Sequence, residues 1–370
     1  MKLTEDKSSV IDTGVLRRTG ELILMALLLC GLTGVSAMGQ AEFSVKSPRA
    51  TRSLLLDAQN VGGTLVVVGE RGHILVSSDG GDTWRQAEVP TRGMLTGVYF
   101  HDNNLGWAVG YYQEILRSRD GGESWQRVYA NREDGRPLLD VWFRDEDNGI
   151  AVGAYGLFLV TGDGGDTWTS KSLNVTQSFA EEEGISSDEM AFLGAFGADE
   201  DELGDDMDAE AGVEVCLNHI ARSATGRLYI AAEVGTIYRS EDDGQSWTAL
   251  ASPYNGSFFN ILPLDGDSLL LLGLRGHLFR SEDGGDTWQE IETGTAASLL
   301  GGVRLAGGSI VVTGLEGTML ISRDGGRSFT YRQHPSRKDI VTAVTPDGKH
   351  VMLVGEFGVK RAKNIASRQD

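Results

Sequence analysis

The sequence predicts an all-β fold, a seven-bladed β-propeller with four-stranded blades. Three observations predict it: a repeat of about 41 residues, a turn motif at the same place in each repeat, and an excess of glycine, 50 of 370 residues. Glycine at this level without a collagen period indicates many tight turns. A period near 40 residues with several short β-rich runs is typical of propeller blades.

The repeat is clearest around one aspartate in each copy. Successive aspartates are separated by 41, 43, 79, 41 and 41 residues. A seventh copy aligns through Gly355 and ends before this motif. The spacing of 79 indicates an insertion of about 38 residues, and about 41 residues precede the first copy. Roughly 291 residues remain, and one seventh of them is about one repeat.

Four strands are expected in each complete repeat. In the second copy, β-branched and aromatic runs place them at Leu95–Phe100, Gly106–Gly110, Glu114–Ser118 and Trp125–Tyr129. The last copy supplies only three. We expect Phe43–Ser47 to complete the last blade and close the ring as an N-terminal strand, so that no strand edge is left open.

The turn motif is Ser-x-Asp-x-Gly-x-Thr/Ser-Trp, an Asp box. Its Asp and Ser/Thr side chains are expected to bond the loop backbone, Gly to supply positive φ, and the aromatic residue to pack between blades. Calcium ligation or catalysis is the alternative, but a catalytic site needs one asymmetric constellation rather than six near-identical copies. The Asp and aromatic positions are Asp79 and Trp84, Asp120 and Trp125, Asp163 and Trp168, Asp242 and Trp247, Asp283 and Trp288, and Asp324 and Phe329.

Residues 1–41 are expected to be a signal peptide or a membrane anchor. An apolar run from Leu22 to Leu32 follows Arg17 and Arg18 and precedes small residues, which is typical of an export signal. Cleavage after Ala37 or Ala41 and retention as an anchor both stay open. We therefore expect residues 42–370 to form the propeller in an exported compartment, a periplasm or a thylakoid-lumen-like space.

The acidic charge is concentrated in one segment. The net charge is −20, and 14 acids with no Lys or Arg lie between Phe179 and Glu214, which leaves about −6 elsewhere. We expect an acidic, mobile insertion at about 175–213. It is either a solvated loop or a flap that competes with an acidic or membrane-proximal partner. The overall charge argues against nucleic-acid binding, and two cysteines argue against a disulfide scaffold.

One longer pattern resembles a known family. The combination F-x-D-x-x-x-G-W/I-A-V-G followed by an Asp box is similar to the photosystem II stability and assembly factor family over about residues 42–364. The resemblance implies an exported seven-bladed propeller without enzymatic activity, acting as a scaffold for membrane-protein assembly. The acidic insertion departs from the photosynthetic members and leaves the client open. The residues that carry the pattern are Phe100, Asp102, Gly106, Trp107, Val109, Gly110, Phe143, Asp145, Gly149, Val152 and Gly153.

No cofactor, metal or catalytic residue is predicted. The six histidines are scattered without ligand spacing, and phosphate-binding and nucleophile motifs are absent. A glycan-binding or glycan-cleaving Asp-box protein, sialidase-like, is the alternative function, because paired carboxylates cannot be recognised among so many acids.

Strand order predicts a partner-binding face. The turns between second and third strands share one face with the connections between blades, and Arg and Tyr, which protein interfaces favour, recur there. The alternative is an ordinary charged surface, since acids occupy the same turns. We expect a monomer whose partner is an integral membrane protein or membrane complex. The residues of this face are Arg71, Arg92, Tyr111, Tyr112, Arg132, Arg136, Tyr155, Arg275 and Arg337.

Overall fold

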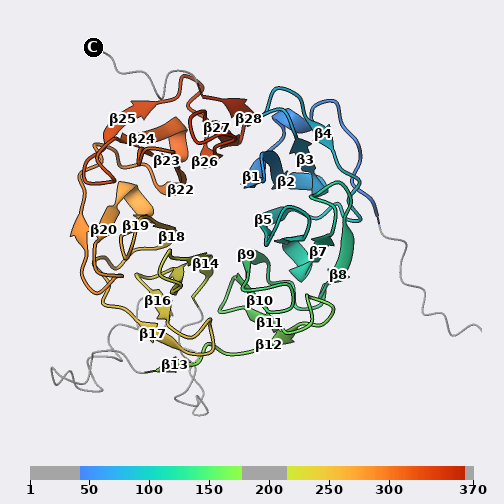
Figure 1. The fold of residues 1–370 in the computed structure, drawn as a ribbon, viewed down its shortest axis with the longest axis horizontal. Coiled ribbons are helices and arrows are strands. Elements are labelled where there is room, and N and C mark those ends of the chain that lie inside the picture. Colours follow the sequence, from blue (N-terminus) through green and yellow to red (C-terminus); the bar gives the residue numbers. More distant parts are fainter. Residues whose placement is uncertain (1–41, 177–214, 363–370) are drawn as a thin grey trace, which may run out of the picture. The chain divides into compact units, whose positions relative to one another are not determined.

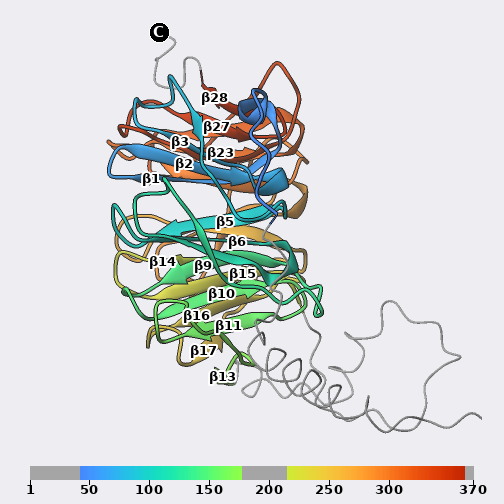
Figure 2. The ribbon, with the colours of Figure 1, turned by 90° about the vertical axis from the view of Figure 1, so that its right-hand side faces the viewer.

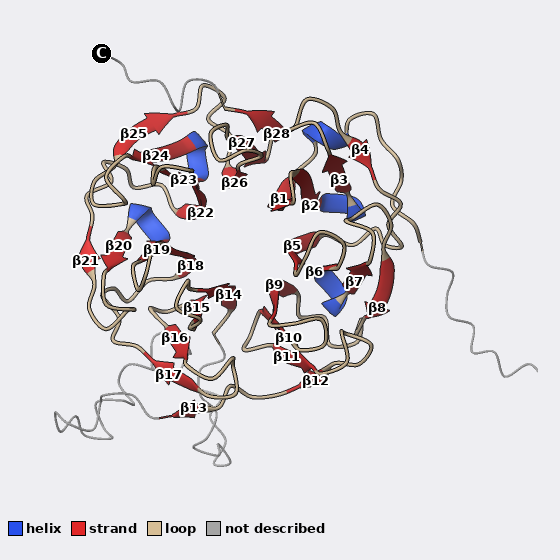
Figure 3. Ribbon diagram, viewed as in Figure 1, coloured by secondary structure: helices blue, strands red, loops and turns tan. Residues whose placement is uncertain are grey.

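The computed structural model describes residues 42–176 and 215–362. They form seven β-sheets arranged as a ring around a central channel (Figure 1). In six sheets the first strand lines the channel and later strands lie successively further out; in the fourth sheet β14 lines the channel and β13 is outermost. The described helices are short 3-10 turns set among strands and loops (Figure 3). The predicted all-β, seven-bladed propeller with four-stranded antiparallel blades is confirmed.

The strands follow the repeat. Blade 1 holds β1 (Leu55–Val61), β2 (Thr64–Gly69), β3 (Ile74–Ser77) and β4 (Arg85–Gln86). Blade 2 holds β5 (Leu95–Phe100), β6 (Gly106–Gly110), β7 (Ile115–Ser118) and β8 (Gln126–Tyr129). Blade 3 holds β9 (Leu138–Phe143), β10 (Gly149–Gly153), β11 (Phe158–Thr161) and β12 (Thr169–Ser170). Blade 4 holds β13 (Val175–Thr176), β14 (Leu217–Arg222), β15 (Leu228–Ala232), β16 (Ile237–Ser240) and β17 (Trp247–Ala249).

The remaining blades continue the pattern. Blade 5 holds β18 (Phe258–Pro263), β19 (Leu269–Gly273), β20 (Leu278–Ser281) and β21 (Gln289–Glu290). Blade 6 holds β22 (Leu299–Arg304), β23 (Ile310–Gly314), β24 (Thr318–Ser322) and β25 (Thr330–Gln333), and blade 7 holds β26 (Ile340–Val344), β27 (Met352–Gly355) and β28 (Gly358–Arg361). The 3-10 turns are η1 (Ala50–Arg52), η2 (Glu70–Gly72), η3 (Tyr111–Gln113), η5 (Leu274–Gly276) and η6 (Leu315–Gly317).

The hydrophobic core lies between blades rather than in one central mass. Seven apolar clusters are present, each built from two neighbouring blades. The aromatic residue of each Asp box packs in the cluster it shares with the preceding blade, as Trp125 does between blades 1 and 2. Phe100 meets Trp125 edge-on, with ring centroids 5.8 Å apart. The prediction that these aromatic residues pack between blades is confirmed.

The Asp boxes form self-contained turns. In the first, the Ser77 hydroxyl donates to Asp79 at 2.8 Å, and the backbone N–H of Thr83 donates to Asp79 Oδ1 at 2.9 Å. The N–H of Gly81, whose φ is +92°, donates to Ser77 Oγ at 2.9 Å. The carboxylate therefore replaces backbone partners that a tight turn cannot supply.

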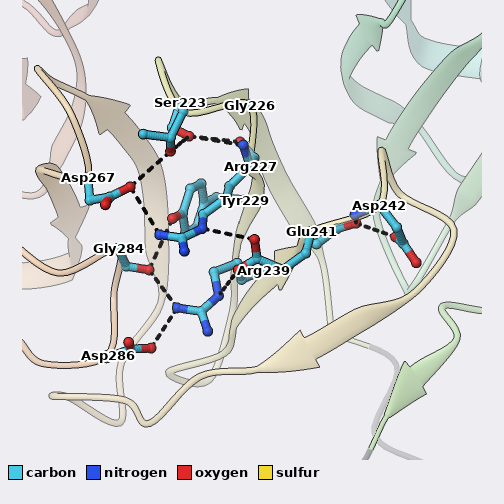
Figure 4. A network of polar contacts seen from close by, with 12 residues as sticks. Ser223, Gly226, Arg227, Tyr229, Arg239, Glu241, Asp242, Asp267, Gly284 and Asp286 are labelled. Carbon is cyan, nitrogen blue, oxygen red and sulfur yellow. Dashed lines mark hydrogen bonds and ion pairs between the residues drawn. The ribbon is translucent and has the colours of Figure 1, made fainter.

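Arginines join neighbouring blades on the Asp-box side. Arg239 of β16 donates to the carbonyl oxygen of Gly284 at 3.0 Å and pairs with Asp286 at 2.6 Å, both in the box of blade 5. Figure 4 shows Arg239 beside Arg227, which pairs with Asp267 of blade 5 at 3.0 Å. Arg117, Arg280 and Arg361 likewise reach the glycine carbonyls of the next box. The Asp-box turns thus connect neighbouring blades as well as the third and fourth strands of their own blade.

The predicted N-terminal closing strand is wrong. Blade 7 has three strands among the described residues, and Phe43–Ser47 lies along blade 1 instead, where the N–H of Ser44 donates to Val89 O at 2.8 Å and Gln86 Nε2 donates to Val45 O at 3.1 Å. Side-chain and backbone groups of blade 1 thus bind the segment. A shared apolar cluster and the contact from Arg361 to Asp82, 2.7 Å, join blades 7 and 1.

Two predicted segments fall largely outside the described residues. These are the leader, 1–41, and the acidic insertion, of which 177–214 are not described. At the start of the predicted insertion, Val175–Thr176 form β13, which pairs with β17 in parallel. Within 42–176 and 215–362, no helix is long and apolar enough to cross a membrane.

Candidate partner-binding face

Six turns between second and third strands share an unusual backbone conformation. Each has a residue other than glycine with φ between 52° and 63°. This left-handed region is uncommon for residues with a Cβ and is least favourable for β-branched ones such as Val234. Such strain gathers where a surrounding structure imposes it, often at binding sites. The six residues are Arg71, Tyr112, Tyr155, Val234, Arg275 and Glu316.

Exposed tyrosines gather on two adjacent blades. Tyr111 and Tyr112 in blade 2 are 43% and 46% exposed, and Tyr155 in blade 3 is 58% exposed. Two of the predicted arginines, Arg132 and Arg136, lie on the connection that joins these blades. We call Tyr111, Tyr112, Arg132, Arg136 and Tyr155 the tyrosine–arginine patch.

A buried carboxylate organises the blade 2 half of the patch. Glu114 is fully buried and accepts from Arg127 at 3.2 Å, from Arg132 at 3.3 Å and from the Thr91 hydroxyl. The guanidinium carbon of Arg132 lies 5.5 Å from the ring centroid of Tyr112, within cation–π distance. Arg132 is therefore held against the tyrosine before any partner arrives.

The sequence contained a signal for Glu114 that the pattern analysis missed. Five other copies have His, Leu or Thr at this position, where the chain enters a buried third strand, and only this copy has an acid. A charge at the entry of a buried strand requires a partner. Arg127, 13 residues further on, is one of those partners and was also missed.

The blade 3 half has a second ion pair. Arg136 pairs with Asp134 at 2.6 Å and donates from Nη1 to the carbonyl oxygen of Tyr155 at 3.2 Å. The hydrogen bond from Arg136 holds the pKa of Asp134 well below its usual range. Arg136 is thereby fixed beside the exposed Tyr155 ring.

The other predicted residues lie apart from this patch. Arg92 donates to Phe43 O at 3.0 Å and pairs with Glu42 at 3.5 Å, so it binds the N-terminal segment. Arg71 and Arg275 stand exposed on blades 1 and 5, and Arg337 is exposed on the connection between blades 6 and 7. Of nine predicted face residues, five thus lie on blades 2 and 3 and the connection between them.

The central channel offers a different kind of site. It holds a cavity of about 740 Å³ lined by the first strands. Burial raises the pKa values of Asp57 and Asp140, in blades 1 and 3, to about 7, and lowers that of His219 to about 4. His219 Nε2 lies 3.7 Å from Asp140.

Both channel carboxylates accept a backbone hydrogen bond from a neighbouring blade. Asp57 accepts the N–H of Val98 in blade 2 at 2.8 Å, and Asp140 accepts the N–H of Ile220 in blade 4 at 2.9 Å. No arginine lies among the described residues that line the cavity. The converging acids and arginines that a sialidase-like site needs are therefore not assembled in this part of the channel.

The Asp-box carboxylates are engaged with their own turns. The hydrogen bond from the Thr167 hydroxyl, together with one from its N–H, lowers the pKa of Asp163 to about 2. No group of three or more His, Cys, Asp or Glu suited to a metal occurs in residues 42–176 and 215–362.

Sequence comparison identifies the family. The model of the photosynthesis system II assembly factor YCF48 matches residues 77–136 and 130–263, together half of the chain. The chain belongs to the YCF48 family. The resemblance inferred from the repeat pattern is confirmed. A comparison with curated proteins finds no significant match.

Solved structures agree with YCF48-family membership at the level of the fold. A YCF48 bound to D1 peptide has a TM-score of 0.59 and 17% identity, over 86% of this chain and 94% of that one. YCF48 from Cyanidioschyzon merolae has a TM-score of 0.60 and 17% identity, over 86% and 98%. The GH74 enzyme of Niastella koreensis has a TM-score of 0.55 and 15% identity, over 86% of this chain and 44% of that enzyme. At these identities the matches establish the propeller alone.

Proposed function

We propose that this YCF48-family propeller is a non-enzymatic scaffold that binds a membrane protein through the tyrosine–arginine patch and assists its assembly or stability. The observation that carries the proposal is the pre-organised pair of Arg132 and exposed Tyr112 above buried Glu114. Side chains ordered before binding lose less conformational entropy when a partner docks. Tyr and Arg are also the residues that most often dominate interface energies.

Two further observations support a membrane protein as the partner. The family is described as assembly factors of photosystem II, and a related propeller has been solved with a D1 peptide. The apolar run at Leu22–Leu32 after two arginines supports export, to a periplasm or a lumen-like space. An exported scaffold would meet the extramembrane loops and tails of membrane proteins.

The partner is tested by affinity capture from detergent-solubilised membranes of the source cells. We expect the wild-type chain to retain a membrane protein that the double variant Tyr112→Ala/Tyr155→Ala loses. Tyr331→Ala is the matched control, because Tyr331 is exposed on β25 in blade 6, away from the patch. Equal recovery by all three chains, or recovery of no membrane protein by the wild type, would contradict the proposal.

The compartment is tested by fractionation of cells that express the full chain with a C-terminal tag. Export predicts protection from protease in intact cells and digestion once the outer barrier is opened. A chain found in the cytosolic fraction would contradict export without bearing on the patch.

A further inference from the structure

Blade 7 ends in a strand whose outer side is unpaired among the described residues. The third strands β3, β7 and β20 are buried throughout, whereas Lys360 and Arg361 of β28 are exposed. In the other blades a fourth strand covers this position. β28 therefore presents an edge that the repeat normally closes.

The repeat shows which backbone groups lack their partner. In blades 1, 3, 4 and 5 a carbonyl near the start of the third strand accepts the N–H of the residue that follows the fourth strand. These bonds run from Ala87 to Ile74, Lys171 to Phe158, Leu250 to Ile237 and Ile291 to Leu278, at 2.8–2.9 Å. Val359 holds the same place in blade 7, since it pairs with Val354 as Ile74 pairs with Val68.

Hydrogen-bond alternation identifies the outward residues. The N–H of Ala362 donates to Val351 O at 2.8 Å on the β27 side. Bonded pairs alternate along an antiparallel ladder, so Lys360 also bonds toward β27, while Val359 and Arg361 direct their backbone groups outward. In the described part of the chain, neither residue has a backbone partner on that side.

The connection that would lead away from a fourth strand is already in place. A Cβ built on Gly72 would lie 2.1 Å from Thr91 O, and one on Gly276 would lie 2.1 Å from Thr295 O. The same test on Gly358 gives 2.0 Å to Thr51 O, so η1 lies against blade 7 as those connections lie against theirs. Figure 2 shows this N-terminal segment beside β28. Blade 7 therefore has the connection that normally follows a fourth strand, but no fourth strand among the described residues.

The exposed side chains on and beside the β28 edge are mainly basic. Lys360 and Arg361 are exposed on β28, and Arg49 and Arg52 are exposed at the two ends of η1. Arg361 pairs with Asp82 at 2.7 Å. Lysine on an edge discourages pairing with apolar strands, but it attracts a strand that carries acids. The chain also adds a strand to an edge elsewhere, where β13 pairs with β17.

We propose that the free edge of β28 binds an extended acidic segment of a partner protein, which adds to blade 7 as a fourth strand. Backbone bonds to Val359 and Arg361 give affinity, and the basic side chains select for acids. This site does not depend on the tyrosine–arginine patch, so the two proposals fail separately.

The probe is a fourth strand taken from this chain. A fluorescent peptide of residues 287–294, Thr-Trp-Gln-Glu-Ile-Glu-Thr-Gly, carries two acids, and its partner peptide has both Glu replaced by Gln. We expect saturable binding to the full chain by fluorescence anisotropy, about tenfold or more weaker for the Gln peptide. Hydrogen exchange should slow at the Val359 and Arg361 amides on binding, with Lys360 as the internal reference.

Two variants separate the backbone from the side chain. Arg361→Pro removes the outward N–H, and Arg361→Ala keeps it while removing the same guanidinium. With both variants folded by circular dichroism, we expect Arg361→Pro to bind the acidic peptide about tenfold or more weakly than Arg361→Ala. Equal binding by the two variants, no binding by the wild type, or protection elsewhere than at β28 would overturn the proposal. So would a wild-type dimer that Arg361→Pro abolishes, since the edge would then belong to a second copy.

Discussion

Arg239 of blade 4 lies 2.6 Å from Asp286 of blade 5, and the same guanidinium nitrogen donates to the carbonyl oxygen of Gly284 at 3.0 Å. The arginine is mostly buried, with 15% of its side chain exposed, whereas 56% of Asp286 is exposed. The carbonyl bond is therefore the better shielded of the two contacts. This contact and the Arg227–Asp267 pair add polar links to the apolar cluster that blades 4 and 5 share.

The first prediction concerns that contact. Arg239→Ala should lower the free energy of unfolding by about 1–3 kcal/mol, because a shielded donor to Gly284 is lost. Asp286→Ala should cost at most about 1 kcal/mol, since its pair is largely solvated. Urea unfolding measures both, and Arg119→Ala, an exposed arginine on the same face, is the control. A cost for Arg239→Ala no larger than that of the control would show that the contact contributes nothing.

The second prediction concerns pH. Burial raises the pKa values of Asp57 and Asp140 to about 7, so the folded chain binds more protons than the unfolded chain between about pH 4 and 7. The free energy of unfolding should therefore fall as pH rises through this window and level off above it. His219, whose pKa burial lowers to about 4, acts in the opposite direction below about pH 6.5. With these values the net loss is steepest near pH 6 and fades above about pH 7.

Substitutions at Asp57 and Asp140 measure how much each acid contributes to this pH dependence. Asp57→Asn and Asp140→Asn should each flatten the decline, whereas Glu146→Gln, an exposed carboxylate, should leave its slope unchanged. Urea unfolding at half-unit steps from pH 5 to 8 gives the comparison. A wild-type stability that is flat or rises through this range would refute the assignment.

Local chemistry made most of the fold predictable. The Asp boxes, the glycine turns and the strands of the second copy are specified by residues a few positions apart, and the structure places β5 and β6 at the predicted bounds. The path of Phe43–Ser47 was not predictable, because an alternating segment can pair with blade 7 or bind beside blade 1 equally well by pattern. The choice depends on partners such as Gln86, which lies about 40 residues away.

The sequence could predict which face of the propeller carries the site, but not which residues of that face lie together. Strand order placed nine residues on one side, yet Glu114 and Arg127 decide which of them are held together. The channel carboxylates are a similar case, since Asp57 and Val98 are 41 residues apart and Asp140 and Ile220 are 80 apart. A repeat pattern shows what copies share, whereas these groups depend on what one copy has alone.

The third prediction follows from Glu114. Glu114→Ala should lower the free energy of unfolding by about 3 kcal/mol, because it leaves Arg127 and Arg132 without their buried acceptor. It should also weaken partner binding as far as Arg132→Ala does, since both release Arg132 from Tyr112. Glu123→Ala is the matched control: its pair with Arg85 is exposed and should be worth at most about 1 kcal/mol. Thermal and urea unfolding together with partner capture give the readouts, and full binding by folded Glu114→Ala would argue against pre-organisation of the patch.

The fourth prediction separates backbone strain from steric conflict at two glycines of blade 1. Gly63 and Gly72 both have positive φ, +98° and +68°, but a Cβ on Gly63 meets nothing within 4 Å while one on Gly72 would lie 2.1 Å from Thr91 O. Gly63→Ala should therefore cost only the strain of the left-handed region, about 1 kcal/mol. Gly72→Ala carries a similar strain and must also displace the connection to blade 2, so it should cost at least about 2 kcal/mol more. Urea unfolding of the two variants measures the difference, and equal costs would mean that the connection yields freely and does not fix the turn.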